Sequence, residues 1–339
     1  MPPNPRSVPR NPGTLPPTPL VRSVGFLLVP GYALLSYAAA VEPLRAANQL
    51  AGKPLYRWCH ATPSGKAAIA SNGVAVLTDL KFGSDVRDLD LMLVCAGGNP
   101  VAFDDKPTFQ WLRRLAGRGV TLGGISGGPA ILARAGLLRG RRCTVHWEHA
   151  AALQERYPTI QLTHSLFELD GDRVTCSGAI ACLDMMVGLI TRDHGYALGA
   201  AVSEWFLHTH IREGGMPYRM DLRSRLSVSE GFLVSALRAM ESNLESPLSR
   251  ERLACVAGVS LRRLERAFRR QLGVGIHQHY LSLRLKRSRQ LLRETSLSVL
   301  EIAMASGFAS GSQFCRAFRA LHGMTPRQAR ERDRPRLVR

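Results

Sequence analysis

Two stretches of the chain repeat one another: LACVAGVSLRRLERAFRRQLG at residues 253–273 and IAMASGFASGSQFCRAFRALHG at residues 302–323. Each copy opens with an aliphatic residue and an alanine, has a glycine four residues after that alanine, and then contains the sequence Arg-Ala-Phe-Arg. Alanine lets two helices approach closely, and glycine can adopt the positive φ that ends a helix. The pattern therefore predicts two helix-turn-helix units, each with a second helix that carries an apolar stripe.

The second helix of each unit has an exposed face of hydrogen-bonding side chains. These are Arg262, Arg263 and Arg266 in the first copy, and Ser312, Gln313 and Arg316 in the second. Arg and Gln can pair with guanine and adenine edges in the major groove. Residues 279–294 predict an amphipathic, Arg-rich connecting helix, so the two units could enter successive major-groove faces about 34 Å apart. The alternative is a repeat of plain helical hairpins with solvated arginines.

The positive charge of the chain is concentrated in the region of this repeat. The 339 residues hold 45 Lys+Arg and 26 Asp+Glu, a formal net charge of +19. Residues 240–339 hold 20 basic and 8 acidic side chains, a net +12, and all the basic ones except Lys286 are arginines. Because arginine binds phosphate in a bidentate manner, this region favours nucleic acid as a partner.

The C-terminal region resembles a known family of DNA-binding domains. Residues 233–332 are similar to the AraC/XylS type, and the segment from Glu301 through Phe318 and Gly323-Met-Thr-Pro326 matches its signature. The resemblance implies seven helices and double-stranded promoter DNA as partner, with RNA polymerase as a further one. It places the base-contacting positions on these residues: Arg262, Glu265, Arg266, Gly311, Ser312, Gln313 and Arg316. Gly311 has no side chain with which to read a base.

Upstream of this region, residues 21–208 alternate between short apolar runs and helical patterns. Strands are predicted at 24–29, 89–95, 120–125, 144–146 and 173–176, and helices at 34–50, 108–118, 129–135 and 179–191. Such alternation predicts an α/β fold, a parallel-sheet, flavodoxin-like sandwich with helices on both faces. The fold class is therefore this sandwich followed by an all-α domain with two helix-turn-helix units.

The remaining segments predict the domain boundaries. Residues 1–20 hold eight prolines and predict a disordered leader, residues 209–232 predict a Gly/Pro-punctuated linker, and residues 333–339 predict a basic tail. The uncharged run from Val24 to Val41 is interrupted by Pro30-Gly31, so we expect a strand, a turn and a helix there, and no membrane partner. Seven cysteines without a CxxC pair favour reduced thiols in the cytoplasm.

A candidate catalytic motif lies between the strand at 120–125 and the helix at 129–135. Gly124-Ile125-Ser126-Gly127-Gly128 fits G-x-S-x-G, which exposes a nucleophile on a strained turn. Taken literally, Ser126 is the nucleophile of an amidase or hydrolase with an accessory DNA-binding domain, which is the alternative function. The candidate bases are His146, His149, His164 and His194, but no Asp-His arrangement is evident from the spacing.

The wider sequence around the motif resembles a family of regulators. Residues 21–205 are similar to the PfpI-like branch of the class I glutamine-amidotransferase-like superfamily in the GlxA-type transcriptional regulators. The similarity rests on Val41–Asn48, Gly97-Gly98, Leu122–Ser126 and Thr144–Trp147. Enzymes of that superfamily place a cysteine at the elbow beside a carboxylate from the first helix. Here those positions are assigned to Ser126 and Glu42, so the resemblance implies a pocket that binds a ligand without catalysis.

The same groups predict an effector site for a small amine or amino-acid metabolite. Backbone N–H groups at Gly97, Gly98, Ser126 and Gly127, with the dipole of the following helix, favour a carboxylate, and Glu42 offers a negative charge to the opposite end of a zwitterion. Aromatic faces for a cationic amine come from Tyr32, Tyr37, Trp147 and Phe167. His146 is assigned to the same pocket. For each aromatic ring the alternative is a place in the core.

These observations lead to one expected function. The chain resembles the betaine- and carnitine-responsive regulators, so we expect a bacterial cytoplasmic activator of catabolic genes, associated with the nucleoid when it is bound to DNA. We expect a homodimer formed through the N-terminal domain and no catalytic residues. His146 and His149 could share one helical face as a metal pair, but no third ligand is specified, so we expect no metal and no cofactor. A ligand-independent architectural DNA binder is a third possibility.

Overall fold

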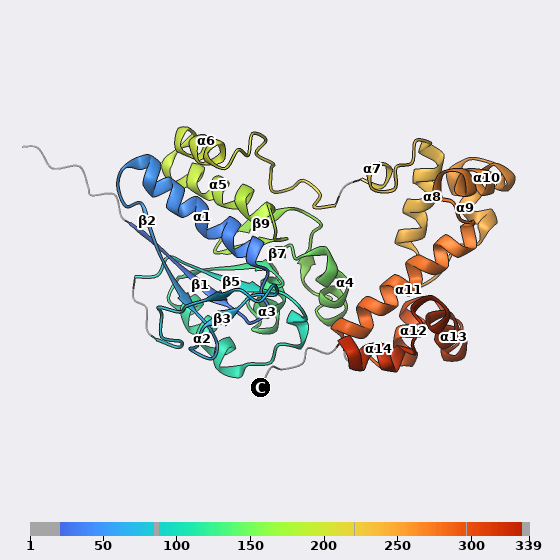
Figure 1. Cartoon of the computed structure of the whole chain (residues 1–339), viewed down its shortest axis with the longest axis horizontal. Coiled ribbons are helices and arrows are strands. Elements are labelled where there is room, and N and C mark those ends of the chain that lie inside the picture. Colours follow the sequence, from blue (N-terminus) through green and yellow to red (C-terminus); the bar gives the residue numbers. More distant parts are fainter. Residues whose placement is uncertain (1–20, 85–87, 220, 296, 334–339) are drawn as a thin grey trace, which may run out of the picture.

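The computed structural model describes residues 21–84, 88–219, 221–295 and 297–333. The expected leader at 1–20 and the tail from residue 334 onward lie outside these described residues. Figure 1 shows an α/β part and a helical part, which are joined by a connecting segment and meet again at one end of a long helix, α11 (Ile276–Glu294). Within the described residues, no helix combines the length and the apolar character needed to cross a membrane.

The α/β part is built on one six-stranded sheet. Its strands in spatial order are β2 (Tyr56–Ala61), β1 (Arg22–Leu28), β5 (Leu91–Ala96), β6 (Thr121–Ser126), β10 (Arg173–Cys176) and β9 (Phe167–Asp170). All neighbours are parallel except β9, which runs antiparallel to β10. Numbered in chain order, the parallel strands lie in the order 2-1-3-4-5 of flavodoxin-like folds. The predicted fold class is confirmed.

Helices cover both faces of the sheet. One face carries α1 (Leu34–Ala51), α5 (Ala181–His194) and α6 (Tyr196–Trp205), and the other carries α2 (Lys106–Gly117), α3 (Gly128–Arg134) and α4 (Trp147–Arg156). Successive residues of the central strands point to opposite faces, so Phe26 packs toward α1 while Leu27 packs on the other side. This burial on both faces explains why the central strands are continuous apolar runs.

Smaller elements connect this framework. They are β3 (Ala68–Ile69), β4 (Ala75–Val76), η1 (Pro100–Ala102), β7 (Arg142–Cys143) and β8 (Gln161–Leu162). The strand predicted at 144–146 is wrong: β7 ends at Cys143, and the chain then runs buried into the N-cap of α4 at His146. Thr144 forms two hydrogen bonds in this buried loop. Its N–H donates to Thr175 Oγ1 (3.0 Å), and its hydroxyl donates to the Ser165 carbonyl (2.7 Å).

The segment that follows α6 returns to the sheet before it reaches the helical part. Leu166 N donates to Met216 O (2.9 Å), and Phe167 N donates to Gly214 O (3.2 Å), so residues 214–216 cover the outer edge of β9. A five-residue helix, α7 (Leu222–Leu226), follows within the range predicted as linker.

A buried carboxylate holds the start of this segment on α5. Asp184 is 0 % exposed and accepts from both the Arg212 backbone N–H (2.9 Å) and the Arg212 guanidinium (2.6 Å). His208 Nε2 lies 2.8 Å from the same carboxylate. A charge buried in this way is tolerated because it is paired and hydrogen-bonded. Asp184 therefore fixes residues 208–212 to the α/β part.

The helical part contains the two repeated units. Its helices are α8 (Gly231–Ser242), α9 (Arg250–Ala257), α10 (Leu261–Leu272), α11, α12 (Val299–Ala305), α13 (Gly311–His322) and α14 (Pro326–Asp333). Serines cap the four helices of the repeat in the same manner, and they are Ser249, Ser260, Ser298 and Ser310. Gly258 ends α9 with φ 67°, and Gly307 follows α12 with φ 74°. The two units form separate apolar cores on either side of α11.

Candidate functional site

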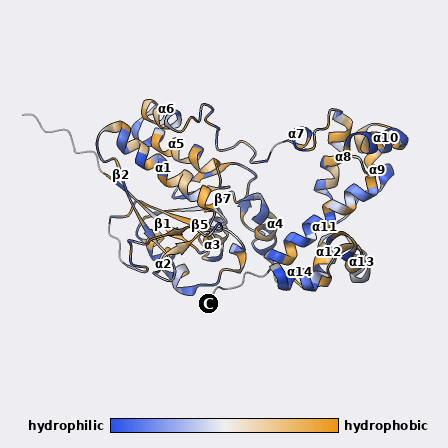
Figure 2. Cartoon of the chain, viewed as in Figure 1, coloured by the Kyte–Doolittle hydropathy of each residue, from blue (hydrophilic) through white to orange (hydrophobic). Residues whose placement is uncertain are grey.

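The two recognition helices, α10 and α13, present equivalent faces. Leu264 and Phe268 of α10 are buried, as are Phe314 and Phe318 at the matching positions of α13. The side chains proposed to read DNA lie on the opposite faces. Exposed in α10 are Arg262, Arg263 and Arg266, and exposed in α13 are Ser312, Gln313 and Arg316. α10 and the rod helix α11 are largely hydrophilic in Figure 2.

Two of the proposed base-reading residues already have partners within the protein. Arg263 lies over the Phe232 ring at 4.8 Å from its centroid, and Glu265 pairs with Arg250 at 3.3 Å. Sequence reasoning had no signal for either contact, because both partners lie outside α10. Arg266 and its counterpart Arg316 are exposed in the middle of their helices.

The serine elbow lies where β6 ends. Ser126 has φ 59°, an uncommon value for a residue other than glycine, and is 7 % exposed. The glycines around it are required because a side chain at these positions would collide with neighbouring atoms. A Cβ on Gly124 would lie 2.5 Å from the Pro129 nitrogen, and a Cβ on Gly128 would lie 1.9 Å from the Val94 carbonyl oxygen. The motif therefore holds a strained serine against the end of β5.

The residue of the first helix that faces this elbow is Ser36, not Glu42. A Cβ built on Gly178 would lie 2.9 Å from Ser126 Cβ and 3.1 Å from Ser36 Oγ, so both serines border the same glycine. Ser36 is 3 % exposed, and its hydroxyl accepts from Ala179 N at 2.7 Å.

The placement of Glu42 beside the elbow is wrong. Glu42 lies six residues beyond Ser36, a rotation of about 240° around the helix. Its carboxylate pairs with Arg45 at 2.7 Å, and its side chain is 43 % exposed. The elbow of this chain therefore brings two hydroxyls together, without the carboxylate that the resemblance implied.

The backbone donors of the predicted site are only partly available. Gly127 N donates to the Ala96 carbonyl at 2.9 Å, so this N–H is engaged and the expectation that it faces a ligand is wrong. Gly97 lies where a Cβ would be 2.7 Å from Gly31 O, and Gly98 has φ 63°. Gly97 and Gly98 thus follow β5 at the point where the turn after β1 crosses it. The helix that follows the elbow, α3, has seven residues, so its dipole is small.

Tyr32 and Tyr37 lie together beside this crossing, on the α1 face of the sheet. Their rings contact edge to face at 5.8 Å between centroids. Tyr32 is 0 % exposed, and its hydroxyl has no hydrogen-bond partner among the described residues. Burial is the main reason that the pKa values of both tyrosines are raised, so both remain protonated. Tyr32 therefore keeps an unsatisfied hydroxyl at the end of β1.

Two residues absent from the sequence prediction complete this cluster. Tyr37 Oη lies 2.8 Å from His60 Nε2, and His60 Nδ1 lies 3.5 Å from Asp79 Oδ2. His60 also stacks on Phe26 at 5.9 Å. His60 belongs to β2, and Asp79 lies in the loop after β4, so no spacing in the sequence could have joined them to Tyr37.

The other predicted effector residues lie apart from Tyr32. Phe167 is on β9 and packs against Gly188 and Gly214. Trp147 is 43 % exposed and is covered by the Arg219 guanidinium at 5.1 Å from the ring centroid. The structure therefore does not bring the four predicted aromatic rings into one cage.

His146 touches the elbow through the backbone. Its N–H donates to the Ser126 carbonyl at 3.1 Å, and its Nδ1 accepts from Glu148 N at 3.4 Å as the N-cap of α4. The Nδ1 atom of His146 is therefore engaged at the start of α4, while its backbone N–H holds the carbonyl of the elbow serine.

Burial keeps two thiols of the α/β part protonated near neutral pH. Among the described residues no group of three or more His, Cys, Asp or Glu side chains could hold a metal ion. Burial raises the pKa of Cys143 to about 12 and that of Cys95 still further. Neither thiol is a nucleophile near neutral pH.

Comparison with known proteins identifies both parts of the chain. Residues 23–192 match the profile described as DJ-1/PfpI family, and residues 253–332 match the profile described as helix-turn-helix domain. The HTH-type transcriptional regulator GlxA of Rhizobium meliloti (strain 1021) is 43 % identical over 315 residues, which cover 92 % of this chain and 97 % of the relative. The HTH-type transcriptional regulator CdhR of Pseudomonas aeruginosa is 43 % identical over 305 residues, 90 % of each chain.

A solved structure supports the α/β part. The crystal structure of an AraC family transcriptional regulator from Pseudomonas putida is 28 % identical and superposes with a TM-score of 0.50. It covers 55 % of this chain and 99 % of that chain. The similarity to GlxA and CdhR extends through both parts of the chain, so it covers the elbow as well as the repeated helices.

Proposed function

The chain belongs to the GlxA-type family of HTH transcriptional regulators, with a DJ-1/PfpI ligand-sensing domain and an AraC-type DNA-binding domain, and we propose that its effector is a small amine or amino-acid metabolite. It is a DNA-binding regulator rather than an enzyme, as its relatives are. A betaine- or carnitine-like zwitterion is the favoured effector, because of the resemblance to regulators that respond to such compounds. On the same ground, the proposal includes a cytoplasmic homodimer that activates catabolic genes together with RNA polymerase.

The observation that carries the effector site is the hydroxyl of Tyr32. In open α/β sheets, ligands bind beyond the carboxyl ends of the strands where the strand order reverses, which is here between β1 and β5. Tyr32 follows β1, and Gly97 follows β5, so both lie at this switch point. A fully buried hydroxyl without a partner carries a desolvation cost that a bound acceptor would remove. We therefore centre the effector site on Tyr32.

The surroundings of Tyr32 favour a ligand with an anionic and a cationic end. The backbone turn at Gly97 and Gly98 supports a carboxylate, which the Tyr32 hydroxyl could also donate to. The face of the Tyr37 ring supports a cationic amine. Glu42 is not part of this version of the site because its carboxylate is paired at the surface. The polar group beside the two tyrosines is instead His60, which contacts Tyr37 and Asp79.

Catalysis by Ser126 is disfavoured by the chemistry of the elbow. Ser126 and Ser36 face the same glycine, so a second hydroxyl, and not the carboxylate implied by the resemblance, lies beside the elbow serine. We propose that Ser126 is retained because its strained backbone positions the ends of β5 and β6 and the His146 N–H.

A thermal-shift screen of the full-length protein tests the effector proposal. The probes are glycine betaine, L-carnitine, choline and free amino acids. A ligand of the native state at 100 times its Kd stabilises it by about 2.7 kcal/mol and raises the melting temperature. We expect a rise with a betaine or carnitine in wild type, a smaller rise in Tyr32→Phe, and an unchanged rise in Tyr196→Phe, a matched variant of an exposed tyrosine on α6. If no probe raises the wild-type melting temperature, this effector class is wrong.

A second arm separates binding from catalysis. Ser126→Ala should retain the ligand-dependent shift and the ligand-dependent change in expression from the target promoter. If Ser126→Ala still binds the ligand but loses regulation and a ligand-converting activity together, the enzymatic alternative is correct.

A further inference from the structure

The rod helix α11 ends against the two chain segments that leave the proposed effector site. Asn99 follows Gly97-Gly98, and its Nδ2 donates to the Arg293 carbonyl at 2.5 Å. Gln290 Nε2 donates to the Glu148 carbonyl in the first turn of α4, and the Arg293 guanidinium lies 3.8 Å from the Glu148 carboxylate. The last turns of α11 therefore touch η1 and α4 at once, as Figure 1 also shows for α11 and α4.

Both contacts lie within a few residues of the elbow. Asn99 is three residues after Ala96, whose carbonyl accepts from Gly127 N (2.9 Å). Glu148 is two residues after His146, whose N–H donates to the Ser126 carbonyl (3.1 Å). A shift of the elbow or of the end of β5 would therefore act on α11 from both sides.

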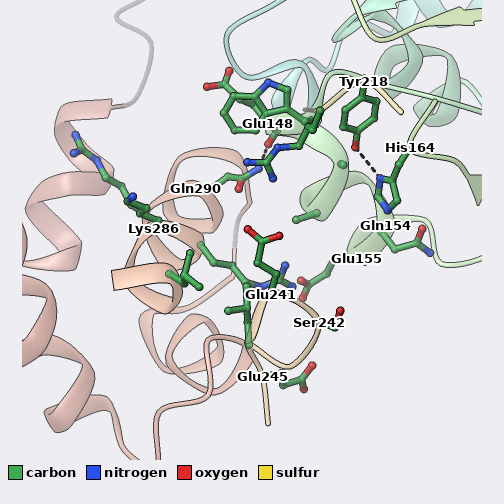
Figure 3. Close-up of a pocket in the computed structure, with 18 of the residues that line it drawn as sticks. Glu148, Gln154, Glu155, His164, Tyr218, Glu241, Ser242, Glu245, Lys286 and Gln290 are labelled. Carbon is green, nitrogen blue, oxygen red and sulfur yellow. Dashed lines mark hydrogen bonds between the residues drawn. The ribbon is translucent and has the colours of Figure 1, made fainter. Parts of the chain in front are cut away.

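A cavity lies beside this contact. It has a volume of about 1600 Å³ and lies between α4 and residues 217–225 on one side and α8 and α11 on the other. Figure 3 shows Glu148 and Gln290 joined at one wall, while Glu155, Glu241 and Glu245 line the open space. Relative motion of two parts is expected where the interface between them is not large and hydrophobic.

Residues nearer the start of α11 contact both helix-turn-helix units. Arg284 donates from α11 to the carbonyls of Ser306 (2.9 Å) and Gly307 (2.6 Å) at the turn of the second unit. Tyr280, one turn earlier, donates to the Asn243 carbonyl beside the first unit (2.6 Å). The position of α11 thus sets the position of both units.

We propose that the end of α11 around Gln290 and Arg293 is the relay that couples effector binding to DNA binding, through η1 on one side and α4 on the other. This proposal rests on the proposed function, because it assigns the regulation of the same effector site. Binding that changes the end of β5 or the elbow changes the docking of α11, and by linkage DNA binding changes the effector site.

One substitution tests the relay without any ligand. A Cβ on Gly127 would lie 2.7 Å from Pro100 Cγ, so Gly127→Ala presses on η1 from the elbow. Gly117→Ala is the matched control, since a Cβ there meets nothing within 4 Å. By hydrogen exchange of the full-length protein, we expect amide exchange at 286–295 to rise about fivefold in Gly127→Ala and to stay at the wild-type rate in Gly117→Ala. The relay is wrong if exchange changes at 97–102 and remains unchanged at 286–295.

A second pair of variants cuts the docking from the side of α11. The double variant Gln290→Glu/Asn99→Asp removes the two side-chain amide donors of this contact. Asn99→Asp keeps the oxygen that accepts from Ala102 N. Gln278→Glu, exposed on the same helix, is the control for the charge that Gln290→Glu adds to α11. We expect faster exchange at 97–102 and 146–149 in the double variant alone. Unchanged exchange at both segments would overturn the docking even if Gly127→Ala fails to fold.

The ligand arm separates this proposal from the one on which it rests. Addition of glycine betaine or L-carnitine should change amide hydrogen exchange at both 97–102 and 286–295 in wild type. In the double variant it should change exchange at 97–102 only. An equal response at 286–295 in both proteins would overturn the relay. If neither compound changes exchange anywhere in wild type, the effector class fails, and the Gly127→Ala comparison still decides the relay.

Discussion

The guanidinium of Arg284 lies 4.1 Å from the centroid of the Phe308 ring. From this position it donates to the Ser306 and Gly307 carbonyls, which follow the last turn of α12 and have no partner within that helix. One side chain of α11 therefore completes the turn of the second helix-turn-helix unit. Burial lowers the pKa of Arg284, although the guanidinium stays charged near neutral pH.

We expect Arg284→Met to destabilise the protein by about 2 kcal/mol, because hydrogen bonds from a charged group are lost and two carbonyls are left unsatisfied. Arg327→Met is the control, since Arg327 is exposed and pairs with Glu331 on its own helix. Urea unfolding of the full-length proteins measures both free energies. Equal losses in the two variants would contradict the capping role.

Tyr32→Phe should leave the free protein as stable as wild type or stabilise it by up to about 1 kcal/mol, because the hydroxyl it removes is buried and unpaired. Tyr280→Phe should destabilise by about 1–2 kcal/mol, because its hydroxyl bonds both Asn243 O and Leu248 N. Thermal unfolding without ligand compares the two. A large loss in Tyr32→Phe would show that its hydroxyl has a partner in the free protein.

The glycines of the two units should differ in their tolerance of alanine. Gly258→Ala should cost about 1 kcal/mol, because φ is 67° but a Cβ there meets open space. Gly307→Ala should cost about 2 kcal/mol more, because its Cβ would also lie 2.4 Å from the Leu244 carbonyl. Denaturant midpoints decide between this order and its reverse.

Arg266→Ala and Arg316→Ala should each relax base preference at one position, at a cost of about 1–3 kcal/mol in specific binding. Both arginines are exposed in the middle of their recognition helices. Duplexes selected from a random pool supply the operator, and binding is then measured against salt concentration. Arg327→Ala should leave base preference unchanged. Unaltered preference in both recognition-helix variants would remove these residues from base readout.

We expect protonation of His279 to destabilise the helical part as the pH falls. Burial, and then the charge of Lys286, lower the pKa of this histidine below its ordinary 6.5. The folded chain therefore binds fewer protons than the unfolded chain, and the contribution present above pH 6.5 is lost as pH falls through that value. We expect the free energy of unfolding to fall more steeply between about pH 7.5 and 5.5 in wild type than in His279→Gln. Parallel curves would rule out this group.

The repeated units and the central strands were predictable because their signals are periodic. The buried positions of the two recognition helices follow the same spacing, and the central strands are apolar on both faces. Edge strands gave no such signal. Strand β2 is mostly half-buried and shows no clear alternation in Tyr56–Ala61, and β9 is short and partly polar.

The elbow itself was predictable from the sequence, but the residues that face it from other elements were not. The glycines around Ser126 point to the elbow, whereas the resemblance points to Glu42 and not to Ser36 as the residue that faces it. Ser36 lies on the buried stripe of α1 with Ala40 and Leu44, and a small polar residue on an apolar stripe was the available signal. The contact of Tyr37 with His60 had no local signal, since it joins a helix to a strand that follows it.

The cover over β9 has a practical consequence for dissecting this regulator. A fragment ending at residue 208 would uncover the unpaired edge of β9, and it would also leave Asp184 without the Arg212 guanidinium. An open strand edge recruits other chains, and a lone buried carboxylate is costly. A sensory fragment meant to remain in solution should therefore continue to about residue 219, so that aggregation of a shorter fragment would not be mistaken for dependence on the DNA-binding part.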